Sequence, residues 1–523
     1  MSGADHKCTS PHTSTTNPIW EPTAGDLKTY RHFDAPLSIT SIKKLVRSPE
    51  QVLQHRFLPL LHFEQKWRRA PKNGKVRKPK IRPIRYACRK DSYIYKHYRE
   101  LLSVHYERVL RERSINDCVL AYRKIPESYR GSKHKTNVEF ARDAFQVVRD
   151  LGDCTAVAID ISDFFGSISH HQIKAVWENL LGVERLPDDH FRVFESITKY
   201  KFVGRDDAYL ALGYSAKDAK GNILYAVDPK TIPMQICTMD RYRKLIVGGR
   251  IVKKNDKPYG IPQGLPISDL LANSYLLDFD QEMVRYAEAR GGKYFRYSDD
   301  ILFVLPGDGR AARGASKFAQ NRIAEHGSEL RINAEKTEIA CFTRTASGQS
   351  CYNLKAIDGS TIRCRTEANE GLSYLGFRFD GKSVYLRNST IANLRGKIAR
   401  SARAIAHAHV NRYEGKTLKY LLDNAPINDF RQKFLHVAEF DEAVAKAEAS
   451  GESPFNVMTF WSYVTRSHRT FASWNPKFFA QLRSLRTYLP NKLDQEIISS
   501  YQKRSNRQQF KAAEKVGADD QKF

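Results

Sequence analysis

The chain has 523 residues, and 86 Lys and Arg against 58 Asp and Glu give it a formal net charge of +28 at pH 7. This length suits two or three structural units, and the positive excess favours a polyanionic partner, because basic side chains release the counterions that nucleic acids condense. No apolar run reaches the roughly 18 to 20 residues that span a bilayer, no apolar signal segment is present, and the eight Cys show no Cys-x-x-Cys spacing. We therefore expect a cytoplasmic protein with reduced thiols and no membrane partner.

The first 150 residues read as a polar tail, a basic ribbon and two helices. Residues 1–25 are rich in Ser, Thr, Pro and His, which is typical of a disordered tail. From Lys66 to Lys90 the chain carries twelve Lys or Arg and no acidic residue, and a turn signal lies at residues 72–75. Because β-branched residues are interleaved with the basic ones, we expect a hairpin with a basic face rather than a plain solvated run. Helices are expected at 93–110 and 134–150.

A mostly apolar strand from Thr155 to Ile159 delivers Asp160 and then breaks into a polar, aromatic turn. Asp163 in this turn either caps it or joins Asp160 at a metal. Residues 172–250 follow as a helical and irregular insert, to which we assign no chemistry.

Two further motifs lie downstream of the insert. A loop rich in Gly, Pro and Gln at 259–268 precedes a helix-like apolar run at 270–283. From Lys293 to Val304, two β-prone runs flank Ser-Asp-Asp, which predicts a tight hairpin. Adjacent carboxylates at one rigid turn repel each other unless a divalent cation lies between them, although a solvated Asp-Asp turn would have the same sequence.

The last third of the chain is mostly helical after a short β segment. A helix is expected at 315–326, followed by polar residues 330–337 and a hairpin around 373–377. From Asn388 onward, apolar residues recur at helical spacing with Arg and Lys on the other faces, which fits either a duplex-tracking helix or ordinary surface solvation.

An acidic strand end, a Gly/Pro/Gln loop opening a helix, and a Tyr-x-Asp-Asp hairpin occur here in the order that resembles right-hand polymerase palms. The resemblance is closest to the reverse transcriptases and extends from Lys72 to Arg387. Short stretches at 81–87, 91–95 and 121–124 resemble the bacterial defence-associated and abortive-infection (antiphage) group. The resemblance implies an α+β right-hand polymerase fold with fingers, an antiparallel palm sheet with packed helices, and a helical thumb. The implied divisions are N-terminal helices and fingers at 26–150, palm at 151–387 including the insert, and a thumb and C-terminal region at 388–523.

Nucleotidyl transfer needs two hard cations held by oxygen ligands. We expect Asp160 and Asp299 to bridge two Mg²⁺ ions, for which Mn²⁺ is a substitute, with Asp300 as a weaker third ligand. The backbone carbonyl of Ile161 is a further candidate.

The resemblance also implies residues for the nucleotide and the primer. Phe165 would pack under the sugar and exclude a 2′-hydroxyl, which favours deoxynucleotides, although it could instead be a core Phe. The other implied nucleotide contacts are Lys80 and Arg82 on phosphate, Gln263 and Gly264 lining the pocket, and Lys336 near the pyrophosphate unless it is a plain surface lysine. The implied primer and template contacts are Tyr297, Leu375, Gly376 and Phe377.

The sequence therefore predicts an RNA-directed DNA polymerase that acts in antiphage defence on an associated non-coding RNA. Its expected partners are deoxynucleoside triphosphates, the RNA template and the DNA product, and a homo-oligomer is compatible with the sequence. Three alternatives stay open: a template-independent, protein-primed DNA polymerase of the abortive-infection type, an RNA-dependent RNA polymerase, and a non-catalytic RNA-binding relic.

Overall fold

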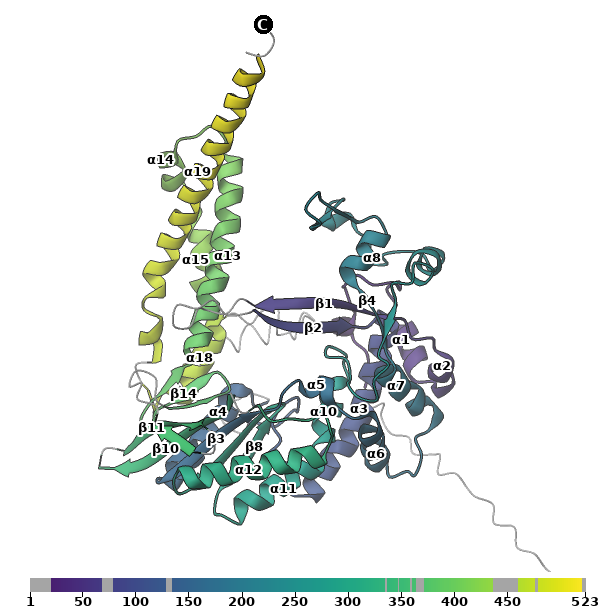
Figure 1. Ribbon diagram of the computed structural model, residues 1–523, viewed down its shortest axis with the longest axis vertical. Helices are drawn as coiled ribbons and strands as arrows, with labels where there is room; N and C mark the ends of the chain where they lie inside the picture. The colour runs from purple at the N-terminus through teal and green to yellow at the C-terminus, as the bar shows by residue number, and fades with distance from the viewer. Residues whose placement is uncertain are drawn as a thin grey trace, which may run out of the picture. The chain divides into compact units, whose positions relative to one another are not determined.

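The structure is a computed structural model that describes residues 20–67, 79–127, 134–333, 336–346, 348–357, 360–363, 371–435, 460–475 and 478–519. The chain forms two compact units, whose elements are labelled in Figure 1. The first comprises Met1–Tyr122, Ile161–Glu282 and Gln320–Arg331, and the second comprises Arg123–Asp160, Met283–Ala319 and Ile332–Phe523. No helix in the described ranges combines the length and apolar character needed to cross a bilayer. The turn expected at 72–75 lies outside these ranges.

The first unit contains a four-stranded sheet and the helices packed with it. The strand order is β2-β1-β4-β7, in which β1 pairs antiparallel with β2 and parallel with β4. The expected hairpin is confirmed as β1 and β2, whose register pairs Leu61 with Tyr86 and Trp67 with Lys80. The main elements of this unit are α1 (Ile39–Val46), α2 (Pro49–Gln54), β1 (Leu60–Trp67), β2 (Lys80–Tyr86), α3 (Arg89–Glu112), α5 (Phe164–Ser167), α6 (His170–Leu181), α7 (Asp188–Thr198), β4 (Lys201–Gly204), α8 (Arg205–Ala211), β5 (Ser215–Lys217), β6 (Ile223–Tyr225), α9 (Met239–Arg241), β7 (Lys253–Lys254) and α10 (Ser268–Tyr275).

Helix α3 supplies much of the core of the first unit. Tyr95, Tyr98 and Leu102 are buried at the three- and four-residue spacing of one helix face. At the start of α3, the fully buried Arg89 pairs with Asp34 at 3.1 Å. Because breaking a buried pair leaves an uncompensated charge, this contact fixes the segment before α1 against α3.

The buried His32 should make this unit less stable in mild acid. Its Nδ1 accepts from the Phe33 amide at 2.9 Å and its Nε2 lies 3.3 Å from the Tyr86 carbonyl, so only the neutral ring satisfies both contacts. Burial lowers the pKa of His32 to about 4, so below pH 6.5 the unfolded chain binds a proton that the folded chain does not. The free energy of unfolding should have its full value above pH 6.5 and should be about 3 kcal/mol smaller near pH 4. Thermal unfolding followed by circular dichroism across this range tests the prediction, and His32→Gln should flatten the profile. An equal slope in the variant would contradict it.

Three expectations for this unit need correction. Residues 20–25, expected to be part of the tail, belong to the structured unit, because Glu21 pairs with Lys43 at 2.7 Å, and the rest of the expected tail lies outside the described residues. The insert contains the sheet strand β4, whose parallel partner β1 is distant in sequence and therefore invisible to a local pattern. The apolar run at 270–283 forms two helices, α10 and α11 (Leu277–Glu288), separated at Leu276.

The second unit contains the expected palm sheet, with strand order β12-β11-β10-β3-β9-β8. A separate three-stranded sheet has the order β13-β14-β15. The main elements are α4 (Asn137–Leu151), β3 (Cys154–Asp160), β8 (Lys293–Tyr297), β9 (Asp300–Pro306), β10 (Glu338–Thr345), β11 (Gly348–Ile357), β12 (Ser360–Arg363), β13 (Leu372–Tyr374), β14 (Phe377–Phe379), β15 (Val384–Leu386), α13 (Asn388–Arg412), α14 (Leu418–Asp423), α15 (Ile427–Leu435), α18 (Phe460–Phe471) and α19 (Leu485–Asp519). Helix α12 (Gly309–Glu325) runs across the boundary between the units.

Both faces of the palm sheet are covered within the second unit. On one face, α4 packs on β3 and β9, and Ala156 and Leu302 join Phe145 in the core. This packing places residues 123–160 in the second unit, so the expected fingers boundary at residue 150 does not match a boundary between units. On the other face, the Tyr286 ring lies 6.2 Å from that of Phe303 of β9 and stacks on Phe318 with ring centroids 4.3 Å apart. Strand β9 is therefore buried on both of its faces from Ile301 to Leu305.

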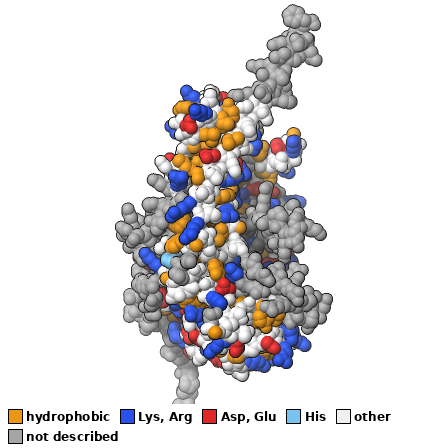
Figure 2. Space-filling view, turned by 90° about the vertical axis from the view of Figure 1, so that its left-hand side faces the viewer, with side chains coloured by type: hydrophobic (Ala, Val, Ile, Leu, Met, Phe, Trp, Pro, Cys, Tyr) orange, Lys and Arg blue, Asp and Glu red, His pale blue; other side chains and the backbone are white. Residues whose placement is uncertain are grey.

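Helices α13 and α19 lie side by side in the region expected to be the thumb (Figure 1). Leu394 and Ile398 of α13 are buried, which confirms their helical spacing, and Arg403 pairs with Glu496 at 3.3 Å. Figure 2 shows Lys and Arg side chains among hydrophobic ones on one face of the molecule, with fewer Asp and Glu. A duplex-tracking role for these helices remains a prediction.

Candidate active site

The carboxylates expected to bind metal lie at the ends of two paired strands in the second unit. Strand β3 ends with Asp160 and β9 begins with Asp300, and the two residues are partners in the antiparallel register. Directly opposed residues project from the same face of a sheet, with Cβ atoms about 4.5 to 5.5 Å apart. The Asp160 carbonyl accepts a hydrogen bond from the Asn333 amide at 2.8 Å, which fixes the strand end.

Asp299 lies in the tight turn that joins β8 to β9. Ser298 adopts a left-handed φ of 61°, which few residues other than Gly, Asn and Asp adopt readily. The fully buried Arg296 donates from its guanidinium to the Ser298 carbonyl at 3.1 Å. Tyr297, expected beneath the primer end, pairs in register with Asp300. The turn is therefore held by a buried side chain at the point where the two acidic residues emerge.

The electrostatics of this site reflect crowding of negative charge. Burial, and then the charges of Asp299 and Asp160, raise the pKa of Asp300 to about 6, although the side chain is accessible at the wall of a pocket. The ammonium group of Lys336 forms an ion pair with Asp160. Lys336 is therefore not a plain surface lysine, because its charge balances one of the crowded carboxylates.

Asp160, Asp300 and Lys336 line a cavity of 280 Å³, and a second ion pair also lies in its lining. Arg387 lies 3.3 Å from Glu338 across this cavity wall, and its positive charge also acts on Asp300. No sequence pattern indicates this pair, because Glu338 opens one strand and Arg387 follows another.

The donor atoms fit a hard divalent cation, since such ions prefer carboxylate and carbonyl oxygens. Within the described part of the chain, no three His, Cys, Asp or Glu side chains are gathered closely enough to hold a metal ion as they stand. In this structure Asp160 forms an ion pair with Lys336. Asp160, Asp299 and Asp300 are the candidates to hold such an ion, and Ile161 is buried directly after Asp160.

The expected primer hairpin is the turn between β13 and β14. Leu375 and Gly376 adopt left-handed φ values of 46° and 94° there. The Asn137 side chain donates to the Leu375 carbonyl at 2.9 Å, and the Arg387 amide donates to the Gly376 carbonyl at 2.9 Å. Phe377 has 0% of its surface exposed, so it anchors the hairpin in the core and cannot reach a primer in this structure. The prediction that Phe377 contacts the primer directly is therefore wrong for this structure.

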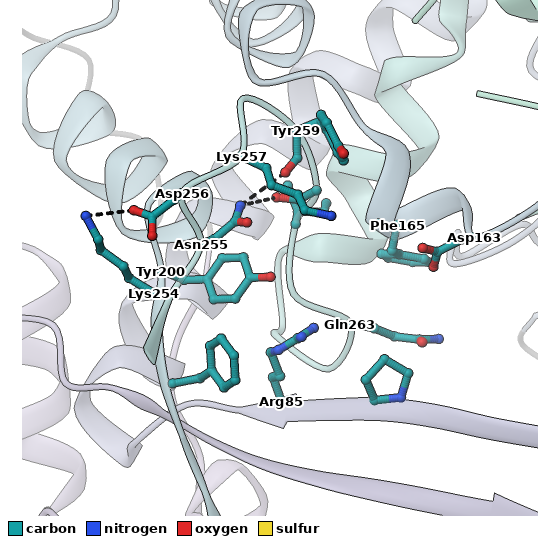
Figure 3. Close-up of a pocket in the computed structure, with 15 residues that line it drawn as sticks. Arg85, Asp163, Phe165, Tyr200, Lys254, Asn255, Asp256, Lys257, Tyr259 and Gln263 are labelled. Carbon is teal, nitrogen blue, oxygen red and sulfur yellow. Dashed lines mark hydrogen bonds and ion pairs between the residues drawn. The ribbon is translucent and has the colours of Figure 1, made fainter. Parts of the chain in front are cut away.

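The other expected nucleotide residues lie in the first unit, around a cavity of 430 Å³ (Figure 3). In this view Phe165 and Gln263 face the cavity from one side, Tyr200 from the opposite side, Arg85 from below and Lys257 from above. The neighbouring Phe164 is 3% exposed and belongs to the core, whereas Phe165 is half-buried and lines the cavity, as does Asp163. The core alternative thus describes Phe164 better than Phe165.

The close packing of the loop at Gly264 against β2 requires a glycine at this position. The Arg85 amide donates to the Gln263 carbonyl at 3.1 Å, which ties this loop to β2. Gly264 has a φ of 119°, and a Cβ atom placed on it would lie 2.6 Å from the Arg85 carbonyl oxygen. Gly264 was expected to line the nucleotide pocket, and the structure adds a close approach of its backbone to β2.

The basic residues of β2 divide between the two faces of the strand. Arg82 is exposed and does not line the cavity, and the side chain of Lys80 lies outside the described residues. Pro83 and Arg85 do line the cavity. Because strand side chains alternate, Arg82 takes one face of β2 and Arg85 takes the other. This alternation can be read from the sequence, and it could have identified Arg85 as the basic residue of β2 on the face opposite Arg82.

Tyr200 and Phe202 of the insert were also missed. Tyr200 immediately precedes β4 and Phe202 lies within it, and both line the cavity beside the pairing of β4 with β1. No local pattern shows this, because the partner strand is more than a hundred residues away.

Comparison with known proteins gives one family match. Residues 233–379 match the family model described as reverse transcriptase (RNA-dependent DNA polymerase), and no curated protein matches the sequence. Among solved structures, apo telomerase from Candida tropicalis truncated from its C-terminal domain has a TM-score of 0.35 at 10% identity, covering 67% of this chain and 61% of that one. Apo telomerase from Candida tropicalis has a TM-score of 0.34 at 12% identity, and the match covers 89% of this chain and 73% of that one. Telomerase from Candida albicans in complex with a TWJ fragment of telomeric RNA has a TM-score of 0.32 at 12% identity. The match covers 87% of this chain and 69% of that one.

This chain thus spans 61% of the first of these structures, and the scores and identities are low. The assignment therefore depends on the family match, which includes the Gln263–Gly264 loop, the Asp299–Asp300 turn and the β13–β14 hairpin. Residues 233–379 are thus similar to the reverse transcriptase (RNA-dependent DNA polymerase) domain, and the mixed helix-and-sheet architecture fits a right-hand polymerase fold.

Proposed function

We propose that this chain copies RNA into DNA from deoxynucleoside triphosphates, with Asp160, Asp299 and Asp300 holding two Mg²⁺ ions. The register of β3 and β9 carries the proposal, because it sets Asp160 opposite Asp300 beside the turn that bears Asp299. Like charges directly opposed across strands destabilise a sheet, so folding alone does not account for this arrangement. A bound cation does account for it.

Polymerases of this family generally use divalent metal ions. Bound at these carboxylates, such ions lower the pKa of the attacking hydroxyl and neutralise the leaving pyrophosphate. Mn²⁺ would substitute for Mg²⁺, since both accept oxygen ligands. Lys336, already at Asp160, would balance charge on the pyrophosphate, and the carbonyl of Ile161 would add an oxygen ligand.

The remaining residues are proposed to position the nucleotide and the primer. Gln263 offers an uncharged amide to the incoming nucleotide, and Gly264 holds this loop against β2. Lys80 and Arg82, both residues of β2, would contact the triphosphate. Tyr297 and the turn at Leu375 and Gly376 would support the primer end.

Phe165 is the proposed selector of deoxynucleotides, since it is half-buried and faces the cavity. Replacing Phe165 with Ala should admit a 2′-hydroxyl and raise kcat/KM for ribonucleotides relative to deoxynucleotides by about tenfold or more. Single-nucleotide incorporation on an RNA template, with each substrate in turn, measures this ratio. Phe165→Tyr keeps the bulk of the ring and should keep the discrimination. An unchanged ratio in Phe165→Ala would remove Phe165 from this role.

We also propose a role in antiphage defence with an associated non-coding RNA as template. The support is the resemblance of the stretches at 81–87, 91–95 and 121–124 to the defence-associated group, together with a net charge of +28, which suits a bound structured RNA. Plaque counts on bacteria that express the wild type or an Asp299→Asn, Asp300→Asn variant test this role. Equal plaque counts for both would reject a defence role that requires polymerisation.

The polymerase proposal itself is tested on a defined primer and RNA template with Mg²⁺. The expected product is DNA whose sequence is complementary to the template, and it should be absent with the Asp299→Asn, Asp300→Asn variant. A product unrelated to the template would instead favour template-independent synthesis, and RNA product would favour an RNA-dependent RNA polymerase.

A further inference from the structure

Arg387 lies in the wall of the cavity that contains the carboxylates Asp160 and Asp300. Its positive charge acts on Asp300 and, together with that of Lys336, opposes the burial that raises the pKa of this carboxyl. The ammonium group of Lys336 is paired with Asp160, so the two cations of the cavity take different positions beside the carboxylates. An Arg placed next to a site of phosphoryl transfer is suited to bind an anionic part of the substrate.

The guanidinium of Arg387 keeps most of its hydrogen-bonding capacity. A guanidinium has five N–H donors in a planar fork. Among the described residues, the one hydrogen bond of this guanidinium runs from Nη2 to the Glu338 carboxylate at 3.3 Å. The side chains of Arg387 and Glu338 are 46% and 43% exposed, and an ion pair with this exposure contributes about 1 kcal/mol or less. Arg387 can therefore bind a second anion without losing a strong interaction.

The backbone of Arg387 is hydrogen-bonded to the turn between β13 and β14. Its amide donates to the Gly376 carbonyl at 2.9 Å, and its own carbonyl accepts from the Thr390 amide at 2.8 Å at the start of α13. The turn is held from its other side as well, because the Leu375 carbonyl accepts from the Asn137 side chain at 2.9 Å. The guanidinium is thus attached to the same turn that is proposed to support the primer end.

A single phosphodiester fits this position better than a triphosphate does. The ion pairs of Lys336 with Asp160 and of Arg387 with Glu338 balance each other and leave Asp300 for the cations of the proposed function. No surplus of positive charge in the cavity lining therefore matches a group with several negative charges. One edge of a guanidinium does match the paired oxygens of a phosphodiester. The last phosphodiester of a primer is separated from the reacting 3′-hydroxyl by one sugar, so it lies near the carboxylates whenever that hydroxyl does.

We propose that Arg387 binds the terminal phosphodiester of a polynucleotide primer and thereby positions the 3′-hydroxyl at the carboxylates, an inference that rests on the proposed function. Glu338 holds the guanidinium beside the cavity, and the Gly376 carbonyl holds its backbone. A side-chain hydroxyl of a protein has no preceding phosphodiester to occupy this position. Arg387 therefore favours a nucleic-acid primer over the protein-primed alternative.

The test measures binding of a labelled DNA primer annealed to an RNA template, by fluorescence anisotropy and without deoxynucleotides. A methylphosphonate at the terminal linkage removes the charge of that phosphodiester and should raise the Kd of the wild-type protein about tenfold. Arg387→Gln should raise the Kd of the ordinary primer by a similar factor. The methylphosphonate should then change the Kd of this variant by less than about twofold, because the interaction is already lost. Arg387→Lys keeps the charge without the planar fork and should restore part of the response.

Two control variants separate phosphate binding from a structural role and from general attraction. Glu338→Gln breaks the same ion pair but keeps the guanidinium, so the methylphosphonate should still weaken its binding about tenfold. Arg344→Gln removes an exposed charge near the opposite end of β10 from Glu338, and it should match the wild type with both primers.

The response to the methylphosphonate decides the outcome. Its loss in Arg387→Gln, with a full response in both controls, supports the inference. This result would do so even if the purified protein incorporates nothing, which would count against the proposed function alone. A full response in Arg387→Gln, or no response in the wild type, would overturn the inference. Equal loss of the response in Glu338→Gln would assign Arg387 to the ion pair alone and would also overturn it.

Discussion

An Asp160→Asn variant is expected to lose DNA synthesis by about a thousandfold or more while keeping its fold. The substitution removes a charged oxygen ligand from the carboxylate group and leaves Lys336 without its partner. A thousandfold corresponds to about 4 kcal/mol of transition-state stabilisation, which is within the range of a metal-bound charge. Steady-state incorporation on an RNA template at saturating deoxynucleotides measures the loss.

Asp153→Asn is the matched control for this variant. Asp153 immediately precedes the other end of β3, where its carboxylate accepts from the Arg344 amide at 2.7 Å, far along the strand from Asp160. It should keep activity within a few-fold of wild type. Asp160→Asn activity within tenfold of the control would contradict a ligand role for Asp160.

Gly264→Ala is the second variant with a large expected effect. A Cβ atom there would lie 2.6 Å from the Arg85 carbonyl oxygen, and the φ of 119° is itself unfavourable for any other residue. The loop must move away from β2, and displacement of a positioning group by about 1 Å can cost on the order of a hundredfold in rate. Backbone strain adds about 1 to 3 kcal/mol of destabilisation. Incorporation kinetics and thermal unfolding measure the two effects.

Gly182→Ala is the control that separates backbone strain at a positive φ from a steric clash of the added Cβ atom. Gly182 also has a positive φ, 69°, but nothing lies within 4 Å of the position that a Cβ atom would take there. This control should lose about 1 kcal/mol of stability and keep wild-type incorporation. If Gly264→Ala behaves no worse than Gly182→Ala, the tight contact between the loop and β2 is not functionally important.

Local sequence patterns were sufficient for the elements that carry the carboxylates. Two apolar, β-prone runs that flank Asp299 and Asp300 predicted the β8–β9 hairpin, and the apolar run before Asp160 predicted β3. The order of the motifs then indicated a palm, which the family match supports. Pairing of β3 with β9 brings Asp160 and Asp300 together, as the resemblance implied.

Contacts between distant segments were beyond the sequence. The ion pair of Lys336 with Asp160 and the pair of Arg387 with Glu338 depend on strand order, which no local pattern encodes. Phe377 was assigned to the primer because the motif contains it, yet its burial is decided by packing within the second unit. Arg85 is different, because strand alternation alone could have distinguished it from Arg82.

The most direct test of RNA-templated synthesis is incorporation of labelled nucleotides by the purified protein with Mg²⁺, with and without prior ribonuclease treatment. We predict deoxynucleotide incorporation that disappears after ribonuclease and in the Asp299→Asn, Asp300→Asn variant, because the protein copies a co-purified RNA at these carboxylates. Incorporation that survives ribonuclease, with product attached to the protein, would contradict RNA-templated synthesis and favour protein-primed polymerisation. A preference for ribonucleotides, or equal incorporation by the variant, would contradict the assigned chemistry.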